Sequence, residues 1–250
     1  TTEIYTLSLH DALPICLAVY FYWLDEELER VQQDAYLAFW TENNLGQRAY
    51  PSLKSIEDEV IAMALSLLGG GDRAGGTFTS GGSESIFLAM MAARNKARAQ
   101  RGVTRPNIVL PNSAHLTFDR AAEALGMEAR RVPIGPDLRA DVDAMAARMD
   151  ADTVAIVGSA PNYPFGTFDA ITRLAALAQA RGAWMHVDAC VGGFLAPYVR
   201  RLGHDVPAFE LSVPGVTSLS ADIHKHGMAP KGASVLLVAD AADREWHKFE

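Results

Sequence analysis

Two side chains in the second half of the chain could together bind a cofactor that carries an aldehyde. Lys225 stands in the segment Ser220-Ala-Asp-Ile-His-Lys-His-Gly227, and Asp188 follows a short apolar stretch. A lysine amine forms a Schiff base with an aldehyde, and a carboxylate keeps a pyridine nitrogen protonated, so that the ring can accept electrons. This pair predicts a site for pyridoxal 5′-phosphate. Because burial disfavours a charged amine, we expect the pKa of Lys225 to be lowered there.

The segment Ser80-Gly-Gly-Ser83 could bind a phosphate group. It comes directly before a predicted helix, so its backbone N–H groups, the Ser83 hydroxyl and the positive end of the helix would face an anion. It lacks the Gly-Lys-Ser/Thr sequence of a P-loop. His224 could donate to the same phosphate, and His115 could stack on a cofactor ring and relay protons.

Each of these features also has an ordinary structural interpretation. Lys225 could be a solvated surface charge, Asp188 could cap a loop, and Ser80–Ser83 could be a simple helix start. His224 and His226 could bind a metal, but a His-x-His pair without a nearby carboxylate or cysteine partner is a weak signal, so we predict no metal site. The histidines that we interpret as structural are His186, His204 and His226.

The apolar pattern predicts an α/β fold. Helical spacing occupies residues 24–40, 52–68 and 84–101, and residues 77–84 are expected to form a turn. From residue 107 onward, short apolar strands alternate with helices. The predicted strands are 107–110, 128–132, 153–158, 183–187, 216–220 and 233–238, and the predicted helices between them are 114–125, 141–149 and 168–181. Strands separated by such helices give a mostly parallel sheet with helices on both faces.

The polar candidates follow the predicted strands. His115 comes after the strand at 107–110, Asn162 after 153–158, Asp188 at the end of 183–187, and His224 with Lys225 after 216–220. In open α/β sheets, ligands bind beyond the carboxyl ends of the strands. We therefore expect these side chains to meet at one edge of the sheet.

Composition narrows the class of protein. The net charge of −8 has no basic block to offset it, which argues against nucleic-acid binding. Two cysteines cannot build a disulfide framework, which favours a reducing compartment. No apolar run approaches the roughly 20 residues that a membrane helix needs. The sequence predicts a soluble cytoplasmic protein without a transmembrane segment.

With these residues identified, the chain resembles the group II pyridoxal-phosphate-dependent decarboxylase superfamily of fold type I, and within it the sphingosine-1-phosphate lyases and their bacterial relatives. The resemblance extends from about Leu17 to the end. It rests on these motifs: Ala18-Val-Tyr20, Thr79-Ser-Gly-Gly-Ser-Glu-Ser85, Asn112-Ser-Ala-His115, Ala160-Pro-Asn-Tyr-Pro-Phe-Gly166, His186-Val-Asp-Ala-Cys-Val-Gly-Gly-Phe-Leu195 and Gly215 to Gly232.

The resemblance implies a role for each candidate. Lys225 would carry the Schiff base, Asp188 would pair with the ring nitrogen, and His115 would stack on the ring. Asn162 would lie beside the ring, and the phosphate would be bound by Gly82, Ser83 and His224. The implied reaction is a retro-aldol cleavage of a phosphorylated long-chain amino alcohol, an amino substrate of lipid origin, to a fatty aldehyde and phosphoethanolamine. The implied assembly is a homodimer.

Two alternatives stay open, because the substrate pocket decides which bond is broken. The first is an α-decarboxylase acting on an amino acid, and the second is an inactive fragment that contributes only a dimer surface. One departure from the lyases lies in residues 43–51, where Gly46 and Gln47 stand in place of a histidine or an Asn-Pro pair.

The sequence also suggests boundaries. Residues 1–15 resemble a translated sequencing adapter and are expected to be non-native, residues 16–55 to form an N-terminal helical segment, and residues 56–250 to form the large cofactor-binding domain. Family members continue into a small C-terminal domain, so we expect the chain to be truncated after Glu250.

Overall fold

The computed structural model describes residues 24–42 and 51–248. The predicted adapter-like segment and all but Pro51 of the departing loop therefore lie outside the described residues. The strands are β1 (Gly75–Thr79), β2 (Asn107–Pro111), β3 (Glu128–Val132), β4 (Thr153–Ser159), β5 (Trp184–Asp188), β6 (Ser218–Ala221) and β7 (Ser234–Val238). The helices are α2 (Glu26–Ala38), α3 (Pro51–Leu67), α4 (Gly82–Arg101), α5 (Thr117–Ala124), α6 (Val142–Arg148), α7 (Ile171–Arg181), α8 (Ala196–Arg201) and the 3₁₀ helix η1 (Ala241–His247).

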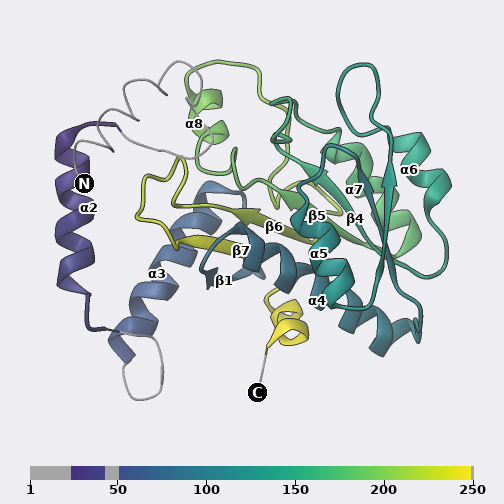
Figure 1. Cartoon of the computed structure of the whole chain (residues 1–250), viewed down its shortest axis with the longest axis horizontal. Coiled ribbons are helices and arrows are strands. Elements are labelled where there is room, and N and C mark those ends of the chain that lie inside the picture. The colour runs from purple at the N-terminus through teal and green to yellow at the C-terminus, as the bar shows by residue number, and fades with distance from the viewer. Residues whose placement is uncertain (1–23, 43–50, 249–250) are drawn as a thin grey trace.

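The seven described strands form one sheet in the order β1-β7-β6-β5-β4-β2-β3 (Figure 1). The pairs from β3 through β2, β4 and β5 to β6 are parallel, whereas β7 is antiparallel to both β6 and β1. Two reversals make β1 parallel to β6. The carboxyl ends of β1, β2, β4, β5 and β6 therefore lie at one edge of the sheet, as the sequence predicted for the last four.

Helices cover both faces of the sheet. One core lies between the sheet and α3, α6 and α7, and the other between the sheet and α4 and α5. The interior strand β4 is buried at every position, which explains its continuous apolar run. The predicted mostly parallel α/β architecture is confirmed. Helix α2 stands apart from the sheet (Figure 1) and buries none of its residues.

Glycines end two of the predicted helices. Gly102 after α4 and Gly182 after α7 have φ of 68° and 62°, and the N–H of each bonds back to carbonyls of the last helical turn. This left-handed closure favours glycine because a side chain would be strained there.

The sequence missed β1, which lies within and before the predicted turn at 77–84. Its two glycines suppress the strand signal, but the structure shows why they are there. A Cβ on Gly76 would lie 2.7 Å from a methyl carbon of Leu237, its partner in β7. Two further elements were not predicted, α8 and η1. Helix α5 begins at Thr117 rather than at residue 114, which leaves His115 in the loop before it.

Across residues 24–42 and 51–248, none of the helices combines the length and the apolar character needed to span a bilayer.

Candidate active site

A cavity of about 380 Å³ lies at the carboxyl edge of the sheet. It is lined by the loops that follow β1, β2, β4, β5 and β6. Six of the seven predicted site residues line it: Gly82, Ser83, His115, Asp188, His224 and Lys225. The structure therefore brings together residues that are far apart in the sequence.

The amino end of α4 forms the wall of the cavity nearest β1. An α-helix leaves its first N–H groups without intrahelical partners, and no side chain caps them here. The carboxylate of Glu84 instead holds the preceding turn, because it accepts bonds from the N–H and hydroxyl of Ser80 at 2.6 and 2.7 Å. Together with the helix dipole, these free N–H groups make the end of α4 suitable for a phosphate.

Gly82 is closely surrounded. A Cβ at this position would lie 2.6 Å from Cys190 Sγ and 2.9 Å from Asp222 Oδ1. Both neighbours are buried. The start of α4 can approach the loops after β5 and β6 only because Gly82 has no side chain.

Lys225 is held by an acidic residue that the sequence reasoning missed. Its Nζ lies 3.0 Å from Asp222 Oδ2, and Asp222 is only 4% exposed. The other oxygen of Asp222 accepts a bond of 2.6 Å from the Ser234 hydroxyl. The available signal was the spacing, since Asp222 precedes Lys225 by three residues in a tight loop.

Asp222 changes the expected protonation of Lys225. Burial alone would lower the pKa of the amine, but neighbouring negative groups outweigh it, so the pKa is raised. Burial also raises the pKa of the Cys190 thiol well above its usual value, and Asp188 and Asp222 add to that rise. Because a neutral thiol supplies no charge, we assign the raised pKa of Lys225 to the two carboxylates. The prediction of a lowered pKa is wrong for the chain without cofactor.

Asp188 ends β5 and is oriented by two donors. Its Oδ1 accepts the Cys190 N–H at 3.1 Å and the Ser220 hydroxyl at 3.5 Å. Within the described part of the chain, Oδ2 accepts no hydrogen bond. A carboxylate oxygen at the cavity is thus available for a protonated ring nitrogen.

His115 stands at the mouth of the cavity, in the loop between β2 and α5. Its Nδ1 lies 2.8 Å from the Thr117 hydroxyl and 3.2 Å from the Thr117 N–H. Tyr163, a residue not predicted, contacts its ring edge-on at a centroid distance of 5.2 Å. These contacts hold the plane of the imidazole ring, which lines the cavity.

His224 presents a donor. Its Nδ1 accepts the Ala233 N–H at 3.2 Å, so a neutral ring carries its proton on Nε2. Burial lowers the pKa of His224, although Asp222 opposes the shift, so the neutral form is favoured. The ring lies beside the turn before α4, since a Cβ on Gly81 would be 3.6 Å from its Cε1. An Nε2–H group near the free N–H groups of α4 suits the same anion.

Asn162 is not brought into the cavity. The residue is fully buried, its Nδ2 donates to the Leu138 carbonyl and the Thr167 hydroxyl, and its Oδ1 accepts the Phe165 N–H. Its amide therefore holds the loop after β4 in shape. The neighbours of Asn162, Pro161 and Tyr163, line the cavity instead.

The arrangement fits pyridoxal phosphate. An amine, a carboxylate, an imidazole ring and an uncapped helix end surround one cavity, and a glycine keeps that end close to the amine and carboxylate loops. These are the groups needed to bind an aldehyde, a pyridine nitrogen, an aromatic ring and a phosphate. No group of three or more acidic, histidine or cysteine side chains in the described ranges could hold a metal ion.

Comparison with known proteins agrees with this geometry. The model of the pyridoxal-dependent decarboxylase conserved domain matches residues 37–245. The sphingosine-1-phosphate lyase of Arabidopsis thaliana is 42% identical over 212 residues, which cover 83% of this chain and 39% of that protein. A probable L-tyrosine/L-aspartate decarboxylase of Methanothermobacter thermautotrophicus is 36% identical over 80% of this chain and 54% of that protein.

Solved structures are similar as well. The sphingosine-1-phosphate lyase of Burkholderia pseudomallei superposes with a TM-score of 0.90 at 40% identity, covering 98% of this chain and 59% of that chain. The chain thus spans about two fifths of the length of the Arabidopsis relative and three fifths of the Burkholderia one.

Proposed function

Because the chain belongs to the pyridoxal-dependent decarboxylase family, we propose that the protein is a carbon–carbon lyase that cleaves a phosphorylated long-chain amino alcohol. The products would be a fatty aldehyde and phosphoethanolamine. Membership confirms the predicted resemblance, the fold type I large domain and the dependence of this domain on pyridoxal phosphate. The observation that carries the choice of reaction is the similarity to the Burkholderia sphingosine-1-phosphate lyase.

We propose that Lys225 holds the cofactor aldehyde and that Asp188 pairs with the ring nitrogen. His115 would lie on the ring, and Gly82, Ser83 and His224 would bind the phosphate. When bound, pyridoxal phosphate supplies an electron sink for the pair of electrons released by bond cleavage. The position of Asn162 supports an indirect role, in which it shapes the loop that presents Tyr163.

Asp222 would prepare Lys225 for the cofactor. Its Oδ2 lies 3.0 Å from Nζ, so the amine is held at the cavity in a defined position. The amine must lose a proton before it can attack an aldehyde, and the same oxygen is placed to accept it. Asp222 would therefore hold the protonated amine in place and then accept the proton that Nζ releases.

The alternative function is α-decarboxylation of an amino acid. It is favoured by one observation, the identity shared with the Methanothermobacter decarboxylase. The two reactions need the same lysine, aspartate and phosphate site, so they are separated by product rather than by these residues.

Two assays on the complete gene product separate the functions. The purified enzyme is incubated with a phosphorylated long-chain amino alcohol and, separately, with a set of amino acids including tyrosine and aspartate. The lyase proposal expects fatty aldehyde from the first and no carbon dioxide from the second. Carbon dioxide without aldehyde would support the decarboxylase, and a Lys225→Ala variant, which should do neither, is the control.

We also propose that the active enzyme is a cytoplasmic homodimer, with residues 16–55 as a helical segment and residues 56–250 as the large domain. Helix α2 supports the dimer, since it exposes Leu37 and is followed by Trp40, each 68% exposed. Light scattering on the wild type and on a Leu37→Glu variant tests this surface. A dimer that persists in the variant would contradict a role for α2, and a chain that binds no cofactor would favour the inactive fragment.

A further inference from the structure

One face of β5 carries a row of polar and aromatic side chains that is almost wholly buried. Side chains alternate across a strand, so Trp184, His186 and Asp188 point to the same face. The neighbouring strand β6 places Ser218 opposite His186 and Ser220 opposite Asp188. His186 and both serines are completely inaccessible to solvent. The row runs from the amino edge of the sheet to the carboxyl edge.

Four hydrogen bonds connect the row without a gap. Trp184 Nε1 donates to Ser218 Oγ at 2.6 Å, and Ser218 Oγ lies 2.7 Å from His186 Nδ1. His186 Nε2 lies 3.3 Å from Ser220 Oγ, which donates to Asp188 Oδ1 at 3.5 Å. The row ends on the carboxylate that we propose pairs with the cofactor.

The two ends fix the direction of every bond. An indole N–H can only donate and a carboxylate can only accept. A serine hydroxyl has one proton and two acceptor sites, so Ser220, which gives its proton to Asp188, must accept from His186 Nε2–H. A neutral ring with its proton on Nε2 leaves Nδ1 as an acceptor, so Ser218 accepts from Trp184 and donates to His186 Nδ1. All four bonds point toward the carboxylate, where they reinforce its negative charge.

The protonation state of His186 agrees with this direction of the hydrogen bonds. A charged imidazole would donate from both nitrogens and would reverse the bond to Ser218. Burial lowers the pKa of His186 to about 3, so the ring is neutral at neutral pH. Phe118 covers the ring edge-on at a centroid distance of 5.8 Å. The position is shaped for one neutral tautomer.

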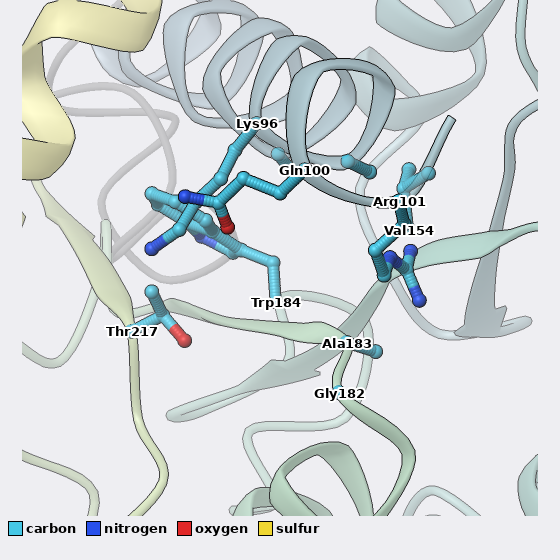
Figure 2. Close-up of a pocket in the computed structure, with 10 residues that line it drawn as sticks. Lys96, Gln100, Arg101, Val154, Gly182, Ala183, Trp184 and Thr217 are labelled. Atoms are coloured by element: carbon cyan, nitrogen blue, oxygen red, sulfur yellow. The ribbon is translucent and has the colours of Figure 1, made fainter. Parts of the chain in front are cut away.

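The donor end of the row is held in place as well. Trp184 lines a cavity of about 120 Å³ at the amino edge of the sheet, shown in Figure 2. Lys96 lies over its ring with Nζ 5.6 Å from the centroid, and the same amine is 2.5 Å from Asp243 of η1. The indole is thus oriented from outside the sheet, and its N–H is fixed on Ser218.

We propose that His186 is a positioning residue, whose Nε2–H tautomer directs the Ser220 hydroxyl onto Asp188 Oδ1 and so holds the carboxylate for the cofactor nitrogen. The inference rests on the proposed role of Asp188. His186 does not touch the cofactor, and it acts through Ser220 alone. Mutation of His186 should therefore change the cofactor site, even though His186 itself lies in the buried core.

The tautomer is measured first, in the chain without cofactor. Two-bond ¹H–¹⁵N spectra distinguish the nitrogens of the seven histidines, and the signals missing from His186→Phe identify this ring. We expect a proton on Nε2, none on Nδ1, and no change near neutral pH. A proton on Nδ1, or a charged ring at neutral pH, would overturn the inference.

The coupling to Asp188 is measured by cofactor affinity. In His186→Gln the amide oxygen can accept from Ser218 and its NH₂ can donate to Ser220, so the direction survives, whereas His186→Phe breaks the row. We expect His186→Phe to bind pyridoxal phosphate about tenfold more weakly, the loss for one hydrogen bond to a charged acceptor. His186→Gln should stay close to the wild type.

A double variant tests whether the effect passes through Asp188. In an Asp188→Asn background, His186→Phe should cause no further loss of affinity. Equal losses in both backgrounds, or equal losses for phenylalanine and glutamine, would indicate a merely structural role and contradict the proposal. A wild-type chain that binds no pyridoxal phosphate would contradict the proposed function instead, and the tautomer would still decide whether the row exists.

Discussion

Replacement of Gly82 by alanine should destabilise the chain and weaken the cofactor site. The new Cβ would lie 2.6 Å from Cys190 Sγ and 2.9 Å from Asp222 Oδ1, about 1 Å inside the 3.5–4.0 Å of normal carbon contact. Neither neighbour can move freely, because Cys190 is packed against Ser220 and Asp222 holds Lys225. Forcing a methyl group into a filled core costs about 1–3 kcal/mol.

Urea denaturation of the cofactor-free chain measures this loss, and heating should lower the melting temperature by about 2–4 °C for each kcal/mol. Gly71→Ala is the matched control, since a Cβ there meets nothing within 4 Å. That control should be neutral or should stabilise by about 0.4–1 kcal/mol. Pyridoxal phosphate should bind less tightly to Gly82→Ala and equally well to Gly71→Ala.

A double-variant cycle identifies the contact. With Cys190 changed to alanine, Gly82→Ala should cost less than in the wild type, because the sulfur atom at 2.6 Å is gone. Equal stability of Gly82→Ala and Gly71→Ala would refute the close approach of α4 to the loop after β5. A cost unchanged by Cys190→Ala would refute the assignment to sulfur.

Three further changes test other contacts. Asp222→Asn should lower the pKa of Lys225, measured as the pH midpoint of Schiff-base formation; an unchanged midpoint would contradict the ion pair between Asp222 and Lys225. The pKa of buried His186 is lowered to about 3, whereas a histidine in the unfolded chain has a pKa of about 6.5. Only the unfolded chain therefore gains this proton as the pH falls below about 6.5, and the free energy of unfolding declines. His186→Gln should flatten this decline, which denaturation measures. Phe118→Ala should cost about 3–5 kcal/mol in the same measurement, since the ring is fully buried; a loss below 1 kcal/mol would show that the core refills.

The sheet was predictable because burial on two faces leaves a simple pattern. β4 is a continuous apolar run, and Gly182 ends the helix that precedes β5. β1 was missed because Gly75 and Gly76 make room for Ala241 and Leu237, two residues far along the chain. Local patterns report local geometry, and this constraint is long-range.

The site was predictable to a similar extent. Residues at the carboxyl ends of strands were expected to meet, and Asp188, His115 and Lys225 do meet at one cavity. The raised pKa of Lys225 depends on where the Asp222 carboxylate points, and the direction of the row through His186 depends on strand register. The spacing puts Asp222 near Lys225, but neither the orientation of that carboxylate nor the direction of the row follows from residue type or spacing. Asn162 also follows a strand, but its amide hydrogen-bonds to Thr167 in its own loop and does not line the cavity.

Chemical trapping of the cofactor tests the central claim most directly. The chain is mixed with pyridoxal phosphate, reduced with borohydride and digested, and the modified peptide is mapped by mass spectrometry. Lys231→Arg, a change in the same loop, is the control for Lys225→Arg. A pyridoxyl group on Lys225, kept in the control and lost in Lys225→Arg, is the predicted result. A folded chain that carries the group on another lysine, or on none, would contradict the assignment of this cavity as the pyridoxal phosphate site.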